Sequence, residues 1–287
     1  MKRIPVHIHL FFVRLAAATA LGLLFGVMIL AAPLAKAGPP QQYLALGDSI
    51  AFGFNPLLNP TNADNFIGYP TPAAAALNKT LTNASCPGET SSHFINLAAA
   101  DHGCAFWRAY YPLHVKYATT QLVFADAFLQ ANPNTHLVSI DIGPNDLFVL
   151  RDGCGGVITC IEAGLPGVLA TLSANLDTIY GHIRNLDGYK NKLVALTIYS
   201  LDYSDPVGTA ITSLLNQVVE DRTRAWGGVV ADGFAAFEVA SLAFNGDTCA
   251  AGLRIVVSAS PLTCDVHPSP AGRDLLAQAI VNALRVD

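Results

Sequence analysis

Short apolar runs rich in β-branched residues alternate along this chain with longer segments of helical spacing. The apolar runs predict strands buried on both faces, at residues 43–46, 94–97, 136–142, 193–199 and 229–231. The segments with apolar residues three and four positions apart predict helices at residues 72–77, 119–131, 165–183, 207–224 and 269–284. Strand followed by helix, repeated, predicts an α/β fold with a mainly parallel sheet that helices cover on both sides.

The helix expected at residues 269–284 has the best-marked start. Ser269 supplies an N-cap and Pro270 a first-turn proline. Its apolar residues form one face: Leu275, Leu276, Ala279, Ile280 and Ala283. The residues just before this helix are therefore held at a fixed helix entrance.

The N-terminus has the pattern of a secretory signal. Basic residues precede an apolar run over residues 15–34, and the small-x-small sequence Ala35-Lys36-Ala37 follows it. We predict a signal peptide at residues 1–37, a single domain at residues 38–287, and a secreted, extracellular protein. The alternative is an uncleaved anchor that contacts the membrane, because the run is about long enough to span a bilayer; Pro33 and the cleavage sequence argue against it.

The charge balance disfavours nucleic acid as a partner. The chain holds 16 Lys and Arg against 21 Asp and Glu. Removal of the signal takes away four basic residues and no acidic ones, which leaves 12 against 21, a formal charge of −9; these four are Lys2, Arg3, Arg14 and Lys36. Nucleic acid is bound mainly through Lys and Arg contacts to phosphate.

The six cysteines all follow the predicted signal: Cys86, Cys104, Cys154, Cys160, Cys249 and Cys264. An even number in an exported chain indicates three disulfides. Sequence alone allows 15 pairings; we favour pairing of neighbours, because each such pair brackets a loop-like stretch. No Cys-x-x-Cys, His-Glu-x-x-His, Gly-x-Gly-x-x-Gly or P-loop sequence is present, so we expect neither a metal nor a cofactor.

Gly47-Asp48-Ser49 follows the first predicted strand of the mature domain. In a doubly wound sheet, ligands gather at the carboxyl ends of the strands, so Ser49 stands where chemistry usually occurs. The same three residues are also typical of a plain strand-ending turn. A serine nucleophile needs a base, and the sequence therefore has to be searched for a histidine.

Only one histidine of the mature chain has a site-like setting. His267 lies two residues after Asp265 and just before the helix that Ser269 caps. The other five have a surface or packing role as the simpler interpretation: His93, His102, His114, His136 and His182.

Two further turns supply donors for a developing oxyanion. Gly88 lies in a turn whose backbone N–H is free to approach a ligand, and Asn145 follows the strand expected at residues 136–142. Glycine turns and Asx-turns are also common without function.

Taken together, the blocks at Ser49, Gly88, Asn145 and His267 resemble the GDSL lipases and esterases, also called SGNH hydrolases, over the whole mature chain. The resemblance implies a three-layer α/β/α sandwich with a flavodoxin-like sheet. It also implies that Ser49 is the nucleophile and His267 the general base, with Ser49 N–H, Gly88 N–H and the Asn145 amide as the oxyanion hole. The cysteine pattern is similar to that of secreted members with three sequential disulfides.

One position departs from the family pattern. Members most often carry the acid three residues before the histidine, where this chain has Cys264, whereas its aspartate is Asp265. Asp265 is the candidate acid, and a backbone carbonyl that orients the ring is the alternative. The acid holds the histidine tautomer and stabilises the imidazolium.

The resemblance implies an ester as substrate, and we expect a small-molecule or lipid ester and a monomer. Two apolar stretches are candidates for the acyl-chain wall. The first holds Phe52, Phe54, Leu57, Leu58 and Phe66, and the second holds Phe106, Trp107, Tyr110, Tyr111 and Tyr117; core packing is the simpler role for aromatics. A carbohydrate O-acetyl esterase and a catalytically silent glycan- or lipid-binding relative are the alternatives.

Overall fold

The computed structural model describes residues 41–186 and 188–285. The predicted signal peptide, residues 1–37, lies outside the described residues and remains a prediction, as does the boundary of the domain at residue 38.

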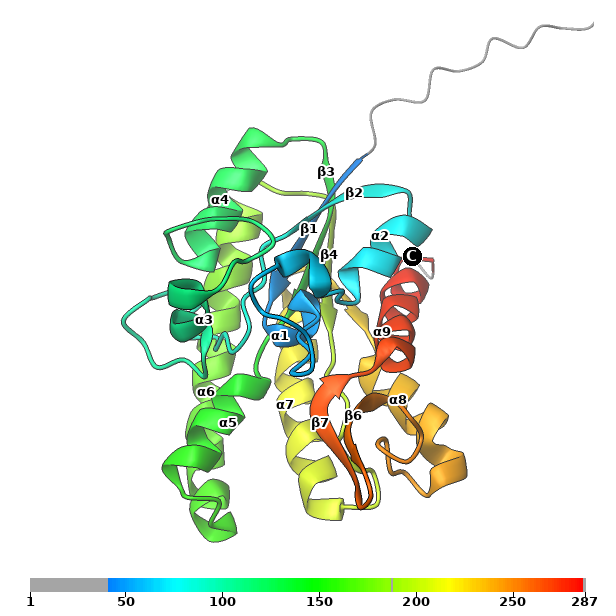
Figure 1. The fold of residues 1–287 in the computed structure, drawn as a ribbon. Coiled ribbons are helices and arrows are strands. Elements are labelled where there is room, and N and C mark those ends of the chain that lie inside the picture. The colour runs from blue at the N-terminus through cyan, green and yellow to red at the C-terminus, as the bar shows by residue number, and fades with distance from the viewer. Residues whose placement is uncertain (1–40, 187, 286–287) are drawn as a thin grey trace, which may run out of the picture. The chain divides into compact units, whose positions relative to one another are not determined.

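Five parallel strands form the central sheet (Figure 1), in the order β2-β1-β3-β4-β5. Their bounds are β1 (Gln41–Gly47), β2 (Lys79–Asn83), β3 (Thr135–Asp141), β4 (Lys192–Leu196) and β5 (Val229–Ala231). The direction in which strands are added to the sheet reverses between β1 and β3. β2 lies on one side of β1, and the later strands β3, β4 and β5 follow on its other side. The carboxyl ends of β1 and β3 are therefore the expected place for a ligand.

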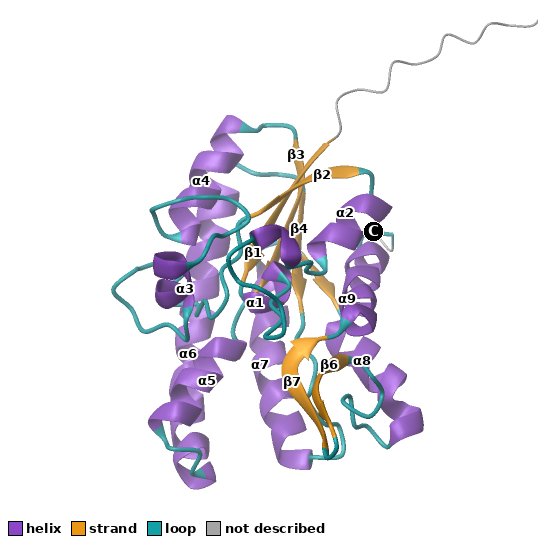
Figure 2. Cartoon of the chain, in the orientation of Figure 1, coloured by secondary structure: helices purple, strands orange, loops and turns teal. Residues whose placement is uncertain are grey.

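Helices cover both faces of the sheet (Figure 2). The helices are α1 (Ser49–Phe52), α2 (Pro70–Ala76), α3 (Cys104–Tyr110), α4 (Gln121–Ala131), α5 (Pro144–Gly153), α6 (Ile158–Gly181), α7 (Pro206–Ala225), α8 (Gly233–Ser241) and α9 (Pro270–Ala283). Leu44 of β1 packs with α4, α6 and α7, whereas the adjacent Tyr43 packs with α2, α8 and α9. This alternation confirms the predicted three-layer α/β/α sandwich.

The prediction of a strand at residues 94–97 is wrong. That segment is a succession of turns, and the strand of this part of the chain is β2, at Lys79–Asn83. Phe94 is buried because it anchors a loop: its carbonyl accepts from Leu122 N (3.1 Å) at the start of α4. β2 escaped prediction because it is an edge strand, in which Lys79 and Thr82 are only partly buried and Thr80 is exposed.

A hairpin absent from the predictions precedes the last helix. It consists of β6 (Arg254–Ala259) and β7 (Leu262–Pro268), which pair antiparallel with each other and not with the central sheet. The last helix, α9, begins as expected, since Ser269 Oγ accepts from Gly272 N (3.3 Å). No helix of the described residues is long and apolar enough to cross a membrane.

Three disulfides join neighbouring cysteines, which is the pairing that the sequence analysis favoured. They link Cys86 to Cys104, Cys154 to Cys160 and Cys249 to Cys264. The first fastens the loop after β2 to α3, the second closes the turn between α5 and α6, and the third fastens β7 to the loop before β6. Disulfides of this number are typical of extracellular proteins.

Candidate active site

Ser49 is the first residue of α1, directly beyond the carboxyl end of β1. Asp48 caps this short helix, because its Oδ1 accepts from Ile50 N at 2.9 Å. Gly47 has φ +132°, and a Cβ at this position would lie 2.2 Å from the carbonyl oxygen of Asp141. Glycine is therefore required where the chain turns from β1 into α1 against β3.

His267 lies on β7 and reaches Ser49, with 2.8 Å between Nε2 and Ser49 Oγ. Its other ring nitrogen, Nδ1, is hydrogen-bonded to Asp265 Oδ1. The same Asp265 oxygen accepts from the backbone N–H of His267 (3.0 Å), so the two-residue spacing is closed by an Asx-type turn. The structure thus brings Ser49, His267 and Asp265 into one hydrogen-bonded line.

Two contacts fix the position of β7, the strand that carries Asp265 and His267. Tyr199, which follows β4, is buried and donates its hydroxyl proton to Val266 O at 2.6 Å. Cys264, next to Asp265, is fastened to Cys249. The family pattern has its acid at the position of Cys264, so in this chain the disulfide occupies that position and the carboxylate comes from the next residue.

The charge of Asp265 is stabilised in place. Burial opposes its ionisation, but the hydrogen bonds and charge of His267, with the charge of Arg254, outweigh burial and lower the pKa of Asp265 below its ordinary value. Asp265 is therefore an anion at neutral pH. It is equipped to fix the His267 tautomer and to stabilise the imidazolium that forms when Nε2 takes a proton.

The two predicted oxyanion donors lie at the same edge of the sheet as Ser49. Gly88 has φ +81°, and a Cβ there would lie 2.4 Å from the carbonyl oxygen of His102, so this turn also needs glycine. Asn145 is the second residue of α5, and its Nδ2 donates to Asp48 Oδ2 (3.2 Å) and to Glu89 O (3.0 Å). Ser49, Gly88, Asn145 and His267 all line one cavity.

Buried polar residues, which the sequence analysis missed, fasten the Gly88 turn to the end of β1. Glu89 Oε2 accepts from Gln121 Nε2 (3.0 Å), and the same Nε2 donates to Gly47 O (3.0 Å). Glu89 Oε1 is hydrogen-bonded to His93 Nδ1. Burial raises the pKa of Glu89, although the bonds from His93 and Gln121 oppose this. No local sequence signal marks Gln121, because its partner lies 74 residues away.

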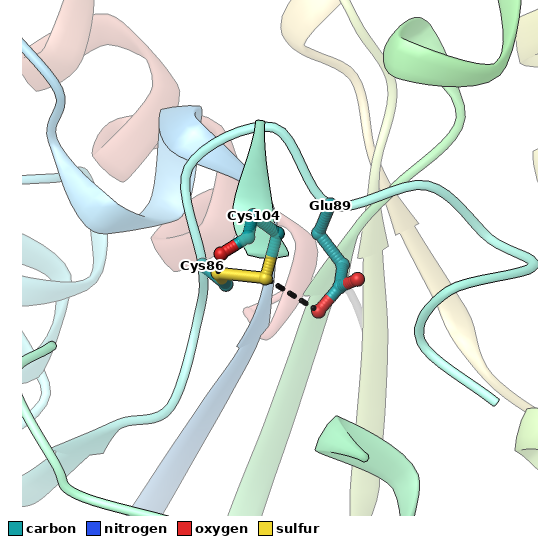
Figure 3. A group of neighbouring side chains, drawn as sticks. All are labelled: Cys86, Glu89 and Cys104. Carbon is teal, nitrogen blue, oxygen red and sulfur yellow. Dashed lines mark hydrogen bonds between the residues drawn. A yellow bond between two sulfur atoms is a disulfide. The ribbon is translucent and has the colours of Figure 1, made fainter. Parts of the chain in front are cut away.

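Figure 3 shows Glu89 beside the Cys86–Cys104 disulfide, the only group of metal-ligand residue types found among the described residues. Its carboxylate Oε2 lies 3.5 Å from Cys104 Sγ. Metals bind thiolates, and both sulfurs are joined to each other, so they have neither a proton to donate nor a thiolate to offer. This group is therefore built as a disulfide with a buried acid, and we assign no metal to it.

The cavity over Ser49 has a volume of about 460 Å³ and mainly apolar walls. Of the predicted wall residues, Phe54, Phe106, Trp107 and Tyr111 line it. Phe52 and Phe66 are buried in a cluster with Trp107 behind this wall. His102, for which a surface or packing role was expected, also lines the cavity, and its Nε2 is hydrogen-bonded to Asp152 Oδ2 at 3.1 Å.

The other predicted wall residues do not line this cavity. Leu57, Leu58 and Tyr110 are exposed. The Arg108 guanidinium lies over the Tyr117 ring, 4.9 Å from the centroid of that ring. The opposite wall comes instead from residues after β3 and β4, among them Leu147, Phe148, Ile198 and Leu201.

Solved structures with the same fold include three enzymes of low sequence identity. Phospholipase A1 from Streptomyces albidoflavus NA297 is 22% identical, with a TM-score of 0.55 over 85% of this chain and 100% of that chain. The extracellular lipase from Streptomyces rimosus is 19% identical, with a TM-score of 0.54 over 85% of this chain and 99% of that chain. An acetylxylan esterase from Geobacillus stearothermophilus is 17% identical, with a TM-score of 0.53 over 86% of this chain and 95% of that chain.

At these identities the structural likeness establishes the fold. No curated protein matches the sequence. The sequence profile of the GDSL-like lipase/acylhydrolase family matches residues 45–275, a segment that begins in β1 and ends within α9. It contains the Ser49, Gly88, Asn145 and His267 blocks in full. The chain therefore belongs to the GDSL-like lipase/acylhydrolase family, a family of carboxylic ester hydrolases.

Proposed function

We propose that this protein is a secreted serine hydrolase that cleaves carboxylic esters through an acyl-enzyme on Ser49. One observation carries the proposal: Ser49 Oγ lies 2.8 Å from His267 Nε2, while Asp265 holds the opposite ring nitrogen. A nucleophile, its base and an orienting acid within hydrogen-bond reach are the parts that acyl transfer needs. A silent binding relative has no chemical use for this line of contacts.

In the first half-reaction, Ser49 Oγ attacks the ester carbonyl and His267 Nε2 takes its proton. The oxyanion forms within reach of Ser49 N–H, Gly88 N–H and the Asn145 amide. His267 then gives its proton to the departing alkoxide, and the alcohol leaves. In the second half-reaction, His267 takes a proton from water and the resulting hydroxide attacks the acyl-enzyme. His267 then returns the proton to Ser49 Oγ as the carboxylic acid leaves.

The cavity walls support an ester with an apolar acyl group. Phe54, Trp107, Phe148 and Ile198 offer hydrocarbon contacts rather than hydrogen bonds. The alternative, a carbohydrate O-acetyl esterase, has the support of the acetylxylan esterase among the structures with this fold. Beyond the reacting groups, apolar side chains outnumber the polar ones, which are Asp48, His102, Tyr111, Tyr199 and Thr212. This balance favours the apolar acyl group over a sugar.

Secretion is part of the same proposal. Three disulfides support an oxidising compartment, and residues 1–37 have the composition of a cleaved signal. The net negative charge of the remaining chain gives no support to a nucleic-acid partner.

Hydrolysis of p-nitrophenyl esters from acetate to palmitate tests the proposal. The purified protein should release p-nitrophenolate, and Ser49→Ala should abolish the release. Ser173→Ala serves as a matched control, because Ser173 lies on α6 and does not line the cavity. A kcat/KM that rises with acyl length supports the lipase or esterase, a preference confined to acetate supports the acetyl esterase, and full activity in Ser49→Ala contradicts the mechanism.

A further inference from the structure

Behind the nucleophile, a chain of buried hydroxyl and carboxyl groups runs through the sheet. Tyr43 OH on β1 and Tyr69 OH before α2 both contact Ser139 Oγ on β3, at 2.7 Å and 3.2 Å. Tyr69 OH also donates to Asp141 Oδ1 at 3.3 Å. Asp141 ends β3, and its backbone carbonyl accepts from Asp48 N at 3.2 Å. Its carboxyl group lies within hydrogen-bond reach of the carboxyl group of Asp48, the residue that caps the helix of Ser49.

The two carboxyl groups differ in how their oxygens are satisfied. Asp48 accepts at both oxygens, from Ile50 N at Oδ1 and from Asn145 Nδ2 at Oδ2. Asp141 Oδ2 is enclosed and has no hydrogen-bond partner of its own among the described residues, and the donors to this carboxyl group are Tyr69 O–H and the Ala51 N–H. Two ionised carboxylates cannot hydrogen-bond to each other, since neither has a proton. A proton on Asp141 therefore allows this carboxyl group to donate to Asp48.

The surroundings favour that proton. Asp48 is 1% exposed and Asp141 4% exposed. Burial, followed by the negative charge of Asp48, raises the pKa of Asp141 well above its ordinary value. Burial also raises the pKa of Asp48, to about 6, against the opposing effects of Ile50 N–H and the His267 charge. Other titratable groups face the pair from the elements around it: Tyr43, Tyr69, Asp146, Tyr199 and His267.

We propose that Asp141 is a positioning residue, which stays protonated and donates to Asp48, and so sets how strongly Asp48 holds the Asn145 amide. The proposal rests on the proposed serine-hydrolase function. Asn145 Nδ2 donates to Asp48 and to Glu89 O, so an oxyanion has to take the place of one acceptor. The bond to Asp48 is the longer of the two and is the one that yields.

The donated proton makes this exchange easier in two ways. It withdraws charge from the Asp48 oxygens, which weakens their competition with the oxyanion for Asn145. It also leaves one negative charge instead of two beside the place where the oxyanion develops. Gly47 permits the arrangement, because a Cβ there would lie 2.3 Å from Asp141 Oδ1. Loss of the proton donor should therefore raise the energy of the transition state and leave substrate binding unchanged.

Two substitutions separate donation from acidity. Asp141→Asn keeps an N–H donor beside Asp48, and we expect it to retain kcat within about threefold. Asp141→Ala removes the donor, and we expect kcat to fall about 10- to 100-fold with KM nearly unchanged, since loss of a direct oxyanion donor costs about 10²–10³. Asp126→Asn, on α4 away from the cavity, is the control and should keep wild-type kinetics.

Infrared spectroscopy reads the proton itself, independently of activity and of whether Asp141→Ala folds. At neutral pH the wild-type spectrum minus that of Asp141→Asn should show the carbonyl band of a protonated carboxyl. Absence of this band overturns the proposal, and so does an Asp141→Ala variant with wild-type kcat. An Asp141→Asn variant as slow as Asp141→Ala also overturns it.

Ser49→Ala, measured in parallel, distinguishes the two levels of the argument. If it is inactive while the Asp141 variants behave like wild type, the inference fails and the proposed function stands. If it is fully active, the proposed function fails, and with it the positioning role of Asp141.

Discussion

The Cys249–Cys264 disulfide fastens the hairpin that carries Asp265 and His267. Among the described strands, β7 pairs with β6 and not with the central sheet, and the Tyr199 hydroxyl ties it to the domain through Val266 O. The bridge spans 15 residues, and a loop of this length corresponds to about 3 kcal/mol of unfolding free energy in the chain-entropy treatment. For a domain of this size that equals a fall of about 6 °C in the thermal midpoint.

The variant with both Cys249 and Cys264 replaced by serine should show this loss of stability together with a loss of activity. Once the bridge is absent, the His267 ring samples positions away from Ser49, and we expect kcat to fall at least about tenfold, because catalysis depends steeply on such distances. Replacement of Cys154 and Cys160, which span only 6 residues and do not line the cavity, is the matched control.

Differential scanning fluorimetry and p-nitrophenyl ester kinetics measure the two effects. The control should lower the midpoint by about 4 °C, from a loop term of about 2 kcal/mol, and should keep the wild-type kcat. Equal kcat in both variants would refute the claim that this disulfide positions the histidine.

Three further predictions concern the site. Asp265→Asn should lower kcat by about 10³- to 10⁴-fold with little change in KM, because the imidazolium loses its counter-charge; wild-type kinetics would hand this role to another group. Gly88→Ala should lower both kcat and the thermal midpoint, because its Cβ would meet His102 O at 2.4 Å at a positive φ; an unchanged midpoint by scanning fluorimetry would contradict this. Burial raises the pKa of Asp48 from its ordinary value of 3.8 to about 6 in the folded protein. Between these two pH values the unfolded chain therefore binds fewer protons than the folded chain. Stability should therefore decline as the pH rises from about 4 to about 6, and denaturant titrations of Asp48→Asn should show a smaller decline.

The sequence predicted the layers of the fold and the four principal site residues because their signals are local. Apolar runs mark β1, β3, β4 and β5. Ser49 and Asn145 stand at the start of the helices that follow β1 and β3, Gly88 lies in a turn after β2, and His267 lies just before the capped helix α9. The edge strand β2 and the β6–β7 hairpin lack such signals, since their side chains are half exposed. The segment around Phe94 was predicted as a strand because a buried residue that anchors a loop is as apolar as a residue of a buried strand.

The support of the site is set by contacts that no local pattern records. Gln121 reaches Gly47 across 74 residues, and Tyr69 reaches Asp141 across 72. Whether Asp265 reaches His267 also depended on the backbone, because its oxygen meets both the ring and the N–H of His267 only in the turn that β7 forms.

The central claim, that Ser49 is a nucleophile activated by His267, is tested most directly by covalent labelling. Diethyl p-nitrophenyl phosphate reacts with an activated serine to form a stable phosphoryl ester and release p-nitrophenolate. We predict one diethylphosphoryl group per protein, located by peptide mass spectrometry on Ser49, and no labelling in His267→Ala. An active protein that is labelled at another residue, or that hydrolyses esters without any labelling, would contradict the account.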